Sequence, residues 1–263
     1  MIGAIIGDVI GSVYEWEEVS STDFILFKDH SRITDDSVLS FAVADAILTK
    51  KTYKETIHSY GNRYPNAGYG GRFRNWLKLP VNQAEPYDSF GNGSAMRVSA
   101  VGYAFDDLAE VLKEAEASAI PSHNHPEGVK GAQAIAGAIW MARQGKTKQE
   151  IKEWVSTTFD YNLDRTTQSI KQYYKFDVTC QGSVPEAIIS FLESEDVESA
   201  IRIGISLNGD SDTIACMAGG IAQAFYRQIP KAIYDEVLER LPDHFIELLK
   251  AFEARYQITY ELI

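Results

Sequence analysis

Two short runs of oxygen-bearing side chains are the residues best suited to chemistry in this sequence. The first run is Thr34-Asp35-Asp36-Ser37, and the second is Asn208-Gly209-Asp210-Ser211-Asp212-Thr213. Each run precedes a stretch with helical periodicity, so one interpretation is that both only cap helix N-termini, where acids face the positive end of the helix dipole. The other interpretation is that the runs together supply carboxylate and hydroxyl ligands, which Mg²⁺, Mn²⁺ and Ca²⁺ prefer.

The residue types narrow the choice of metal. Zinc favours nitrogen and sulfur ligands, and the sequence contains neither an H-E-x-x-H nor a C-x-x-C motif. The spacing after Asp210 and Asp212 does not continue as an EF-hand loop, which disfavours a lone calcium site. If the two runs meet in space, their carboxylates repel one another and their pKa values rise, unless divalent cations neutralise them.

Two further segments have binding character. The run Gly91-Asn92-Gly93-Ser94-Ala95-Met96-Arg97 is a glycine-containing turn before an apolar helix, where backbone N–H groups can hold a phosphate with Arg97 nearby. The run Ser122-His123-Asn124-His125-Pro126 holds two of the five histidines. We expect these histidines to contact substrate rather than metal. An ordinary turn and an ordinary helix cap are the alternatives for the two segments.

The apolar opening segment predicts a helix that is largely buried. Gly3, Gly7 and Gly11 recur every four residues and would line one face. Because glycine costs about 1 kcal/mol per helical site, three on one face indicate that another backbone approaches closely. Asp8 and Glu15 are seven residues apart, so they would share a face two turns from each other. The alternative is that both acids are solvated at the surface.

Stretches of apolar residues at helical spacing predict the helices that hold these runs in place. They predict helices over Asp35–Lys50, His125–Arg143, Pro185–Leu192, Ser211–Tyr226, Tyr234–Leu241 and Phe245–Tyr256. Ser183 is the expected N-cap of the helix that contains Pro185. Residues 61–71, 79–93 and much of 157–182 have loop composition, and their length is typical of functional loops. With no alternating strand pattern longer than about five residues, we expect an all-α fold.

The amino-acid composition indicates the broad class of protein. Of the 263 residues, 45% are hydrophobic, which is enough for one domain over residues 1–263. The formal charge of −12 disfavours general nucleic-acid binding. Cys180 and Cys216 are too few for a disulfide scaffold and suit buried thiols in a reducing cytoplasm. No run reaches the roughly 18 apolar residues of a membrane span, and the opening segment lacks the basic region of a secretion signal. We therefore expect a cytoplasmic protein without membrane contact.

Taken together, the motifs resemble those of the ADP-ribosylglycohydrolase family. They stand here as Gly7-Asp8-x-x-Gly11-x-x-x-Glu15, Thr34-Asp35-Asp36-Ser37, Gly91-Asn92-Gly93-Ser94-Ala95-Met96-Arg97, Ser122-His123 and Gly209-Asp210-Ser211-Asp212-Thr213. They follow the family order and extend over residues 7–213. Ser37 stands where threonine is usual, and Asn208 where glycine is frequent. Neither departure removes an expected ligand.

The resemblance implies an orthogonal helical bundle with a central cleft that holds two Mg²⁺ or Mn²⁺ ions. The implied metal ligands are Thr34, Asp35, Asp36, Asp210, Asp212 and Thr213. Asp210 would bridge the ions, and Glu15 would be a mobile acid near the scissile bond. Asp8 would either bind a metal through water or support the ligands.

The resemblance also implies a substrate. His123 would contact the adenosine or ribose, and the turn Gly91–Ala95 would hold the pyrophosphate. The further substrate-binding candidates are Asp8, Met96, Ser122 and Ser211. The expected reaction is hydrolysis of the C1″ glycosidic bond of an ADP-ribosylated protein or nucleic-acid adduct, with arginine, serine or a nucleobase as acceptor and ADP-ribose as product. Glu15 or Asp35 would move the proton, and Asp210 completes the expected catalytic set.

Three questions stay open at the level of sequence. A metal-free glycosidase with two carboxylates and an ADP-ribose-binding protein without turnover are alternatives to the metalloenzyme. The loops 60–74 and 157–182 would touch the acceptor, although their basic residues also suit ordinary solubility; these are Arg63, Arg72, Arg74, Lys171 and Lys175. The apolar run 24–27 suits the core, a hairpin edge or an interface.

Overall fold

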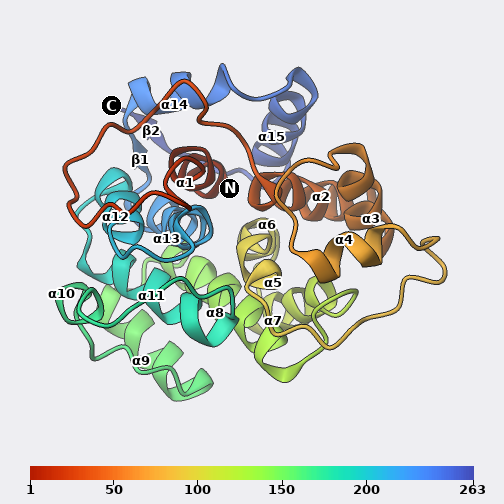
Figure 1. Ribbon diagram of the computed structural model, residues 1–263, viewed down its shortest axis with the longest axis horizontal. Coiled ribbons are helices and arrows are strands. Elements are labelled where there is room, and N and C mark those ends of the chain that lie inside the picture. The colour runs from red at the N-terminus through yellow and green to blue at the C-terminus, as the bar shows by residue number, and fades with distance from the viewer.

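The computed structural model describes all residues, 1–263, and consists almost entirely of helices (Figure 1). The helices are α1 (Ile2–Gly11), α2 (Asp35–Thr49), α3 (Tyr53–Arg63), α4 (Gly71–Leu77), α5 (Gly93–Met96), α6 (Ser99–Ala104), α7 (Leu108–Ala119), α8 (Pro126–Arg143), α9 (Lys148–Phe159), α10 (Thr167–Ile170), α11 (Cys180–Glu193), α12 (Val197–Ile205), α13 (Ser211–Tyr226), α14 (Lys231–Leu238) and α15 (Asp243–Arg255). Two short parallel strands, β1 (Gln228–Ile229) and β2 (Glu261–Leu262), are the only others. The prediction of an all-α fold is confirmed.

Helix α1 lies at the centre of the molecule beside α13, and the remaining helices surround this pair (Figure 1). Every residue of α1 is buried. Its glycine face contacts the backbone of α13 in antiparallel order, with the pairs Gly3 to Gly219, Gly7 to Ala215 and Gly11 to Asp212. A Cβ atom at Gly7 would lie 2.6 Å from the amide nitrogen of Cys216. The predicted close approach of a second backbone is therefore confirmed.

The antiparallel contact determines which helix ends meet. The C-terminal end of α1 lies against the N-terminal end of α13, where the second acidic run begins. Helix α2 packs against α1 and starts at the first acidic run, with Thr34 as its N-cap. Two runs separated by more than 170 residues thus start neighbouring helices.

The opening helix is too short to contain both Asp8 and Glu15. Helix α1 ends at Gly11, and the amide of Ser12 closes it on the carbonyl of Asp8 at 2.8 Å. The chain then turns, so Glu15 lies beyond the helix. The expectation that Asp8 and Glu15 share one helical face is wrong, because the helix stops before it reaches Glu15.

The start of α11 also differs from expectation. It begins at Cys180, where the Thr179 hydroxyl accepts the amide of Gly182 at 3.1 Å. The Ser183 hydroxyl instead donates to the carbonyl of Thr179 at 2.6 Å, and Pro185 lies inside the helix. The prediction of Ser183 as N-cap is therefore wrong, because a capping hydroxyl four residues earlier starts the helix.

Residues 12–34 cross the surface between α1 and α2 without forming a hairpin. Phe24 and Phe27 are half-buried against the core, whereas Ile25 between them is 71% exposed. The guanidinium of Arg202 stacks over the Phe24 ring at 5.0 Å. The apolar run 24–27 is thus the edge of the core. None of the helices combines the length and hydrophobicity that a bilayer span requires.

The α1–α13 contact yields a stability prediction. Gly7→Ala should lower the free energy of unfolding by about 2–3 kcal/mol, because the new methyl group forces two helix backbones apart. Gly220→Ala is the matched control, since its Cβ would lie 3.4 Å from the Cβ of Ala4, an ordinary contact. This control should change the free energy by less than about 1 kcal/mol. Urea unfolding measures both, and equal effects would contradict the packing argument.

Candidate active site

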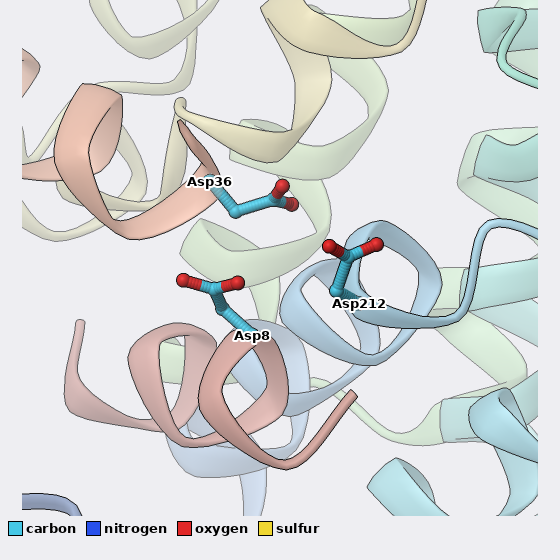
Figure 2. A group of neighbouring side chains, drawn as sticks. All are labelled: Asp8, Asp36 and Asp212. Carbon is cyan, nitrogen blue, oxygen red and sulfur yellow. The ribbon is translucent and has the colours of Figure 1, made fainter. Parts of the chain in front are cut away.

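Three buried carboxylates from three helices meet beside the centre of the fold. They are Asp8 of α1, Asp36 in the first turn of α2 and Asp212 in the first turn of α13, and their side chains point toward one another (Figure 2). One carboxylate oxygen from each lies within 4.8 Å of the others. Their exposed fractions are 0%, 2% and 4%. The two acidic runs predicted to form one site are therefore adjacent in space.

Asp8 holds the start of α2 in place. Its Oδ2 atom accepts the amides of Thr34 at 2.9 Å and Ser37 at 3.1 Å, together with the Ser37 hydroxyl. Its Oδ1 atom accepts the Thr34 hydroxyl. Burial raises the pKa of Asp8, while these hydrogen bonds lower it. One carboxylate therefore satisfies four donors at a helix N-terminus, which orients the acids that follow.

Asp36 is the least satisfied member of the cluster. Its Oδ2 atom accepts the Thr213 hydroxyl at 3.3 Å, whereas the Thr34 hydroxyl, also 3.3 Å away, donates its proton to Asp8. Its Oδ1 atom is buried and has no hydrogen-bond partner. Burial, followed by the neighbouring carboxylates, raises the pKa values of Asp36 and Asp212 well above the usual range. An orphaned acceptor among crowded acids is the environment that a cation would complete.

No basic side chain neutralises these acids. None of the ion pairs in the chain involves Asp8, Asp36 or Asp212, and the same holds for Asp35 and Asp210. The groups around the cluster are hydroxyls, amides and other carboxylates, together with the thiol of Cys216. Burial, followed by the charge of Asp36, raises the pKa of this thiol well above the usual range, so it is not a thiolate ligand, and its Sγ atom donates to the Met96 carbonyl at 3.4 Å. This chemistry fits a hard divalent cation and does not fit zinc.

The side chain of Asp210 shows that the second acidic run does more than cap a helix. Asp210 occupies the N-cap position of α13, yet its side chain caps no amide of that helix. Its Oδ2 atom instead accepts the side-chain amide of Asn92 at 2.7 Å, and that amide also donates to Ser183. The first run is different, because Thr34 does cap α2. The capping interpretation therefore explains only part of the first run and does not explain Asp210.

A cavity of about 490 Å³ opens beside the acids. Glu15, Asp35 and Asp210 line it together with Asp36, Asp212 and the two threonines of the runs. Burial, followed by the charge of Asp210, raises the pKa of Glu15. Asp35 is half-buried, and burial followed by the charge of Asp8 raises its pKa well above the usual range. The catalytic candidates thus share one wall with the metal-ligand candidates.

Another part of the cavity wall, next to the acids, is built from the glycine turn and the histidine segment. Its wall includes Gly91, Asn92, Gly93, Met96, Arg97 and His123. Five other predicted substrate-binding residues are absent from the cavity wall: Asp8, Ser94, Ala95, Ser122 and Ser211. Ser94 is fully buried, and its hydroxyl donates to the carbonyl of Gly128 at 2.7 Å. These residues therefore lie behind the surface that a ligand would touch.

The backbone of the turn is only partly free to bind an anion. The amide of Gly91 donates to the Ser89 hydroxyl at 3.2 Å, and the amide of Asn92 donates to the Val178 carbonyl at 2.8 Å. The amides of Gly93 and Ser94 have no such partner within the chain. The free donors of the predicted cradle are thus confined to its second half.

A hydrogen-bonded chain sets the protonation of His123. Arg97, which is fully buried, donates from Nη2 to the Ser122 hydroxyl oxygen at 3.1 Å, and that hydroxyl lies 2.8 Å from Nδ1 of His123. Because the Ser122 oxygen already accepts from Arg97, we assign its proton to the bond with Nδ1, which leaves the ring proton on Nε2. A Cβ atom at Gly93 would lie 3.0 Å from Nε2, so glycine leaves room for a ligand there.

Several wall residues were missing from the sequence expectations. Trp16 and Phe176 stack at 5.2 Å, and they are 81% and 43% exposed. Arg72 stacks over the Tyr87 ring at 4.9 Å. Trp16 directly follows Glu15, while Tyr87 and Phe176 lie in residues 79–93 and 157–182, whose length indicated functional loops without showing which residues face the cavity. Of the basic loop residues, Arg72 and Arg74 line the cavity, whereas Arg63, Lys171 and Lys175 do not.

His123 provides a pH prediction. Burial, followed by the charges of Arg97 and Arg72, lowers its pKa well below 6.5. The ring should therefore stay neutral, with its proton on Nε2, from pH 8 down to pH 6. Two-dimensional ¹H–¹⁵N NMR of the ring nitrogens measures this directly, and Ser122→Ala should produce a mixture of tautomers. Titration of His123 near pH 6.5 would contradict the assigned hydrogen-bond chain.

Comparison with known proteins gives the family of the chain. The family model described as ADP-ribosylglycohydrolase matches residues 1–259. ADP-ribosylhydrolase ARH3 of Gallus gallus is 26% identical and is aligned over 100% of this chain and 91% of its own length. ARH3 of Homo sapiens is also 26% identical, over 88% of this chain and 86% of its own. ADP-ribosylarginine hydrolase Tri1 of Pseudomonas putida is 22% identical, over 86% and 69% respectively.

A solved structure shows the same fold. An ADP-ribosylglycohydrolase-related protein complex contains a chain that superposes with a TM-score of 0.65 at 19% sequence identity. The superposition covers 98% of this chain and 94% of the other. Because the family model spans nearly the entire sequence, the chain belongs to the ADP-ribosylglycohydrolase family.

Proposed function

We propose that this protein hydrolyses the C1″ glycosidic bond between ADP-ribose and an acceptor, with a pair of Mg²⁺ or Mn²⁺ ions in the acidic cluster. The observation that carries the proposal is the group of buried carboxylates without basic partners, placed at one end of a cavity of about 490 Å³. The relatives named as ADP-ribosylhydrolases support the substrate class.

The residues that would hold the ions are Thr34, Asp35, Asp36, Asp210, Asp212 and Thr213. The orphaned Oδ1 atom of Asp36 supports this assignment, because a bound cation would give it a partner. When bound, the ions would neutralise the acids, fix the hydroxyls of the distal ribose and stabilise developing charge. Asp8 supports the ligands from behind, since four donors of the α2 N-terminus already occupy it.

The chain's own residues would bind and orient the substrate from the part of the cavity wall formed by the glycine turn and His123. Nε2–H of His123 is a donor for the adenosine side, and the free amide of Gly93 is a donor for a diphosphate. The buried guanidinium of Arg97 adds positive charge to this part of the wall, because no carboxylate pairs with it. These groups would place the distal ribose at the acids.

Proton transfer would fall to carboxylates beside the acid cluster. Glu15 and Asp35 line the cavity with Asp210, so each can hold a proton near the scissile bond. Asn92 would fix the orientation of Asp210 through its 2.7 Å hydrogen bond. The stacked pair of Trp16 and Phe176 lies next to Glu15 in the same wall, and we place the acceptor on this side.

The test is a panel of defined ADP-ribosylated arginine, serine and nucleotide substrates, assayed with Mg²⁺, with Mn²⁺ and with EDTA. We expect free ADP-ribose to be released from at least one substrate, and only with a divalent cation. Tight ADP-ribose binding without turnover on any linkage would instead favour a binding protein. Turnover that EDTA does not affect would favour a glycosidase that uses carboxylates alone.

The substitution Asp212→Asn tests whether Asp212 binds a metal ion or has only a structural role. Activity should fall by more than about 100-fold, and Mg²⁺ should no longer raise the melting temperature. In EDTA the variant should melt above the wild type, because one of several repelling buried carboxylates is gone. Asp164→Asn is the control, because the Asp164 side chain is 89% exposed and lies outside the cavity wall. A variant that loses activity but keeps the full Mg²⁺ response would refute the ligand assignment.

Trp16→Ala tests the acceptor side. The KM for an acceptor-bearing substrate should rise about tenfold through loss of the aromatic contact, while the Kd for free ADP-ribose should stay within about twofold of the wild type. Tyr173→Ala is a matched control, because Tyr173 is an exposed aromatic residue on the segment that carries Phe176, but it lies outside the cavity wall. Equal losses for substrate and for free ADP-ribose would place the acceptor elsewhere.

A further inference from the structure

A second cavity, of about 180 Å³, lies at the C-terminal end of α13, remote from the acid cluster. Its wall is formed by Tyr103, Arg143, Gln223, Ala224, Arg227 and the segment 256–259 after α15. No carboxylate is among the wall residues. Gln223 lies eleven residues after Asp212 on the same helix, which corresponds to roughly 16 Å along its axis. The two cavities are therefore separate sites joined by one buried helix.

The amide of Gln223 has an unambiguous orientation. Its Oε1 atom accepts the nitrogen of Met1 at 2.7 Å and the amide of Gly3 at 2.8 Å. The Nε2 group must therefore point away from α1, and it is buried without a hydrogen-bond partner. Gln223 as a whole is 2% exposed. Two N–H donors in the wall of this cavity thus lack an acceptor, which a bound ligand would supply.

Tyr103 adds a third orphaned group from another helix. Its hydroxyl is also buried without a partner, and the residue is 3% exposed. Burial, and to a smaller extent the charge of Glu253, raises the pKa of Tyr103. The Glu253 carboxylate accepts the Tyr260 hydroxyl at 3.1 Å and is outside the wall. Two residues of the cavity wall, one from α6 and one from α13, thus each carry an unpartnered polar group.

Positive charge is concentrated in the same wall. Arg143 donates from Nη1 to the Gly102 carbonyl at 3.0 Å, and Arg227 donates from Nη2 to the Arg143 carbonyl at 2.6 Å. The carboxylate within ion-pair distance of these guanidiniums is Asp106, 3.9 Å from Arg143 and fully exposed. Hydrogen bonds to backbone carbonyls thus account for the position of one guanidinium nitrogen of each arginine. They do not explain why Arg143, which is partly buried, and Arg227, which is exposed, lie close together with one exposed carboxylate as their counter-ion.

We propose that this cavity binds a small oxyanion, of the phosphate or short-carboxylate class, between Arg143 and Arg227. The side-chain amide of Gln223 and the hydroxyl of Tyr103 would donate to its oxygens. The volume suits one such group, whereas the active cavity is more than twice as large. Because Gln223 also ties the start of α1 to α13, the anion would stabilise the helix pair that carries Asp8 and Asp212.

The test uses inorganic phosphate and the full chain in EDTA, at constant ionic strength set with chloride. Phosphate should raise the melting temperature of the wild type by about 2–5 °C at saturation. The double variant Arg143→Gln/Arg227→Gln should lose this shift. Arg240→Gln should keep it, because Arg240 is another partly buried arginine but lies outside this wall. A double variant that responds like the wild type would place phosphate elsewhere, including in the active cavity.

A second measurement covers the case in which the double variant does not fold. The side-chain amide signal of Gln223 in ¹H–¹⁵N NMR spectra of the wild type should move with phosphate concentration and saturate. Acetate in place of phosphate distinguishes the two ligand classes, since the tighter ligand shifts the signal at the lower concentration. A Gln223 signal that neither anion moves would overturn the proposal.

Discussion

Mutual repulsion among buried carboxylates is the constraint on which the rest of the structure depends. Asp36 and Asp212 lie beside Asp8 in the interior, and no lysine or arginine pairs with any of them. Burying even one unpaired carboxylate costs several kcal/mol. A fold that places several together is stable with them ionised only if something else supplies positive charge. The surrounding hydroxyls and amides reduce this cost, but the free Oδ1 atom of Asp36 shows that they do not remove it.

The helix packing keeps these acids at contact distance. Glycines on α1 let its backbone touch α13, and this contact aligns the end of one helix with the start of the other. Asp8 then holds the first turn of α2 through hydrogen bonds to its amides and hydroxyls. The positions of the three carboxylates therefore follow from backbone contacts and capping, and not from the loops that vary most easily in a protein. This arrangement suits a site in which ligand spacing determines affinity.

Local patterns predicted some helices and missed others, both near the site and at the surface. Apolar spacing predicted α13 with its observed bounds, and the glycine repeat predicted the close partner of α1. Helices α3 and α9 were not predicted, although Thr52 and Thr147 each begin a capping box with a glutamate three residues later. Their apolar faces are narrow because they lie at the surface. A search for capping boxes would have found them.

The wall of the active cavity was less predictable, for two physical reasons. Trp16, Tyr87 and Phe176 come from irregular segments that only the tertiary fold brings together, so no sequence spacing marks them. Conversely, Ser94 and Ser122 belong to recognisable motifs but act from behind the wall, where Ser122 orients His123 and Ser94 holds the turn against α8. A motif identifies residues that serve one site without showing which of them face the ligand.

We propose that acids at the starts of α2 and α13 hold divalent cations, with Asp8 of α1 behind them. Crystals grown with Mn²⁺ and measured at the manganese absorption edge test this most directly. The account predicts anomalous density between Asp36, Asp210 and Asp212, with Asp8 behind these ligands. Anomalous density confined to His123 or to surface carboxylates, or a fully ordered cluster without any manganese, would contradict it.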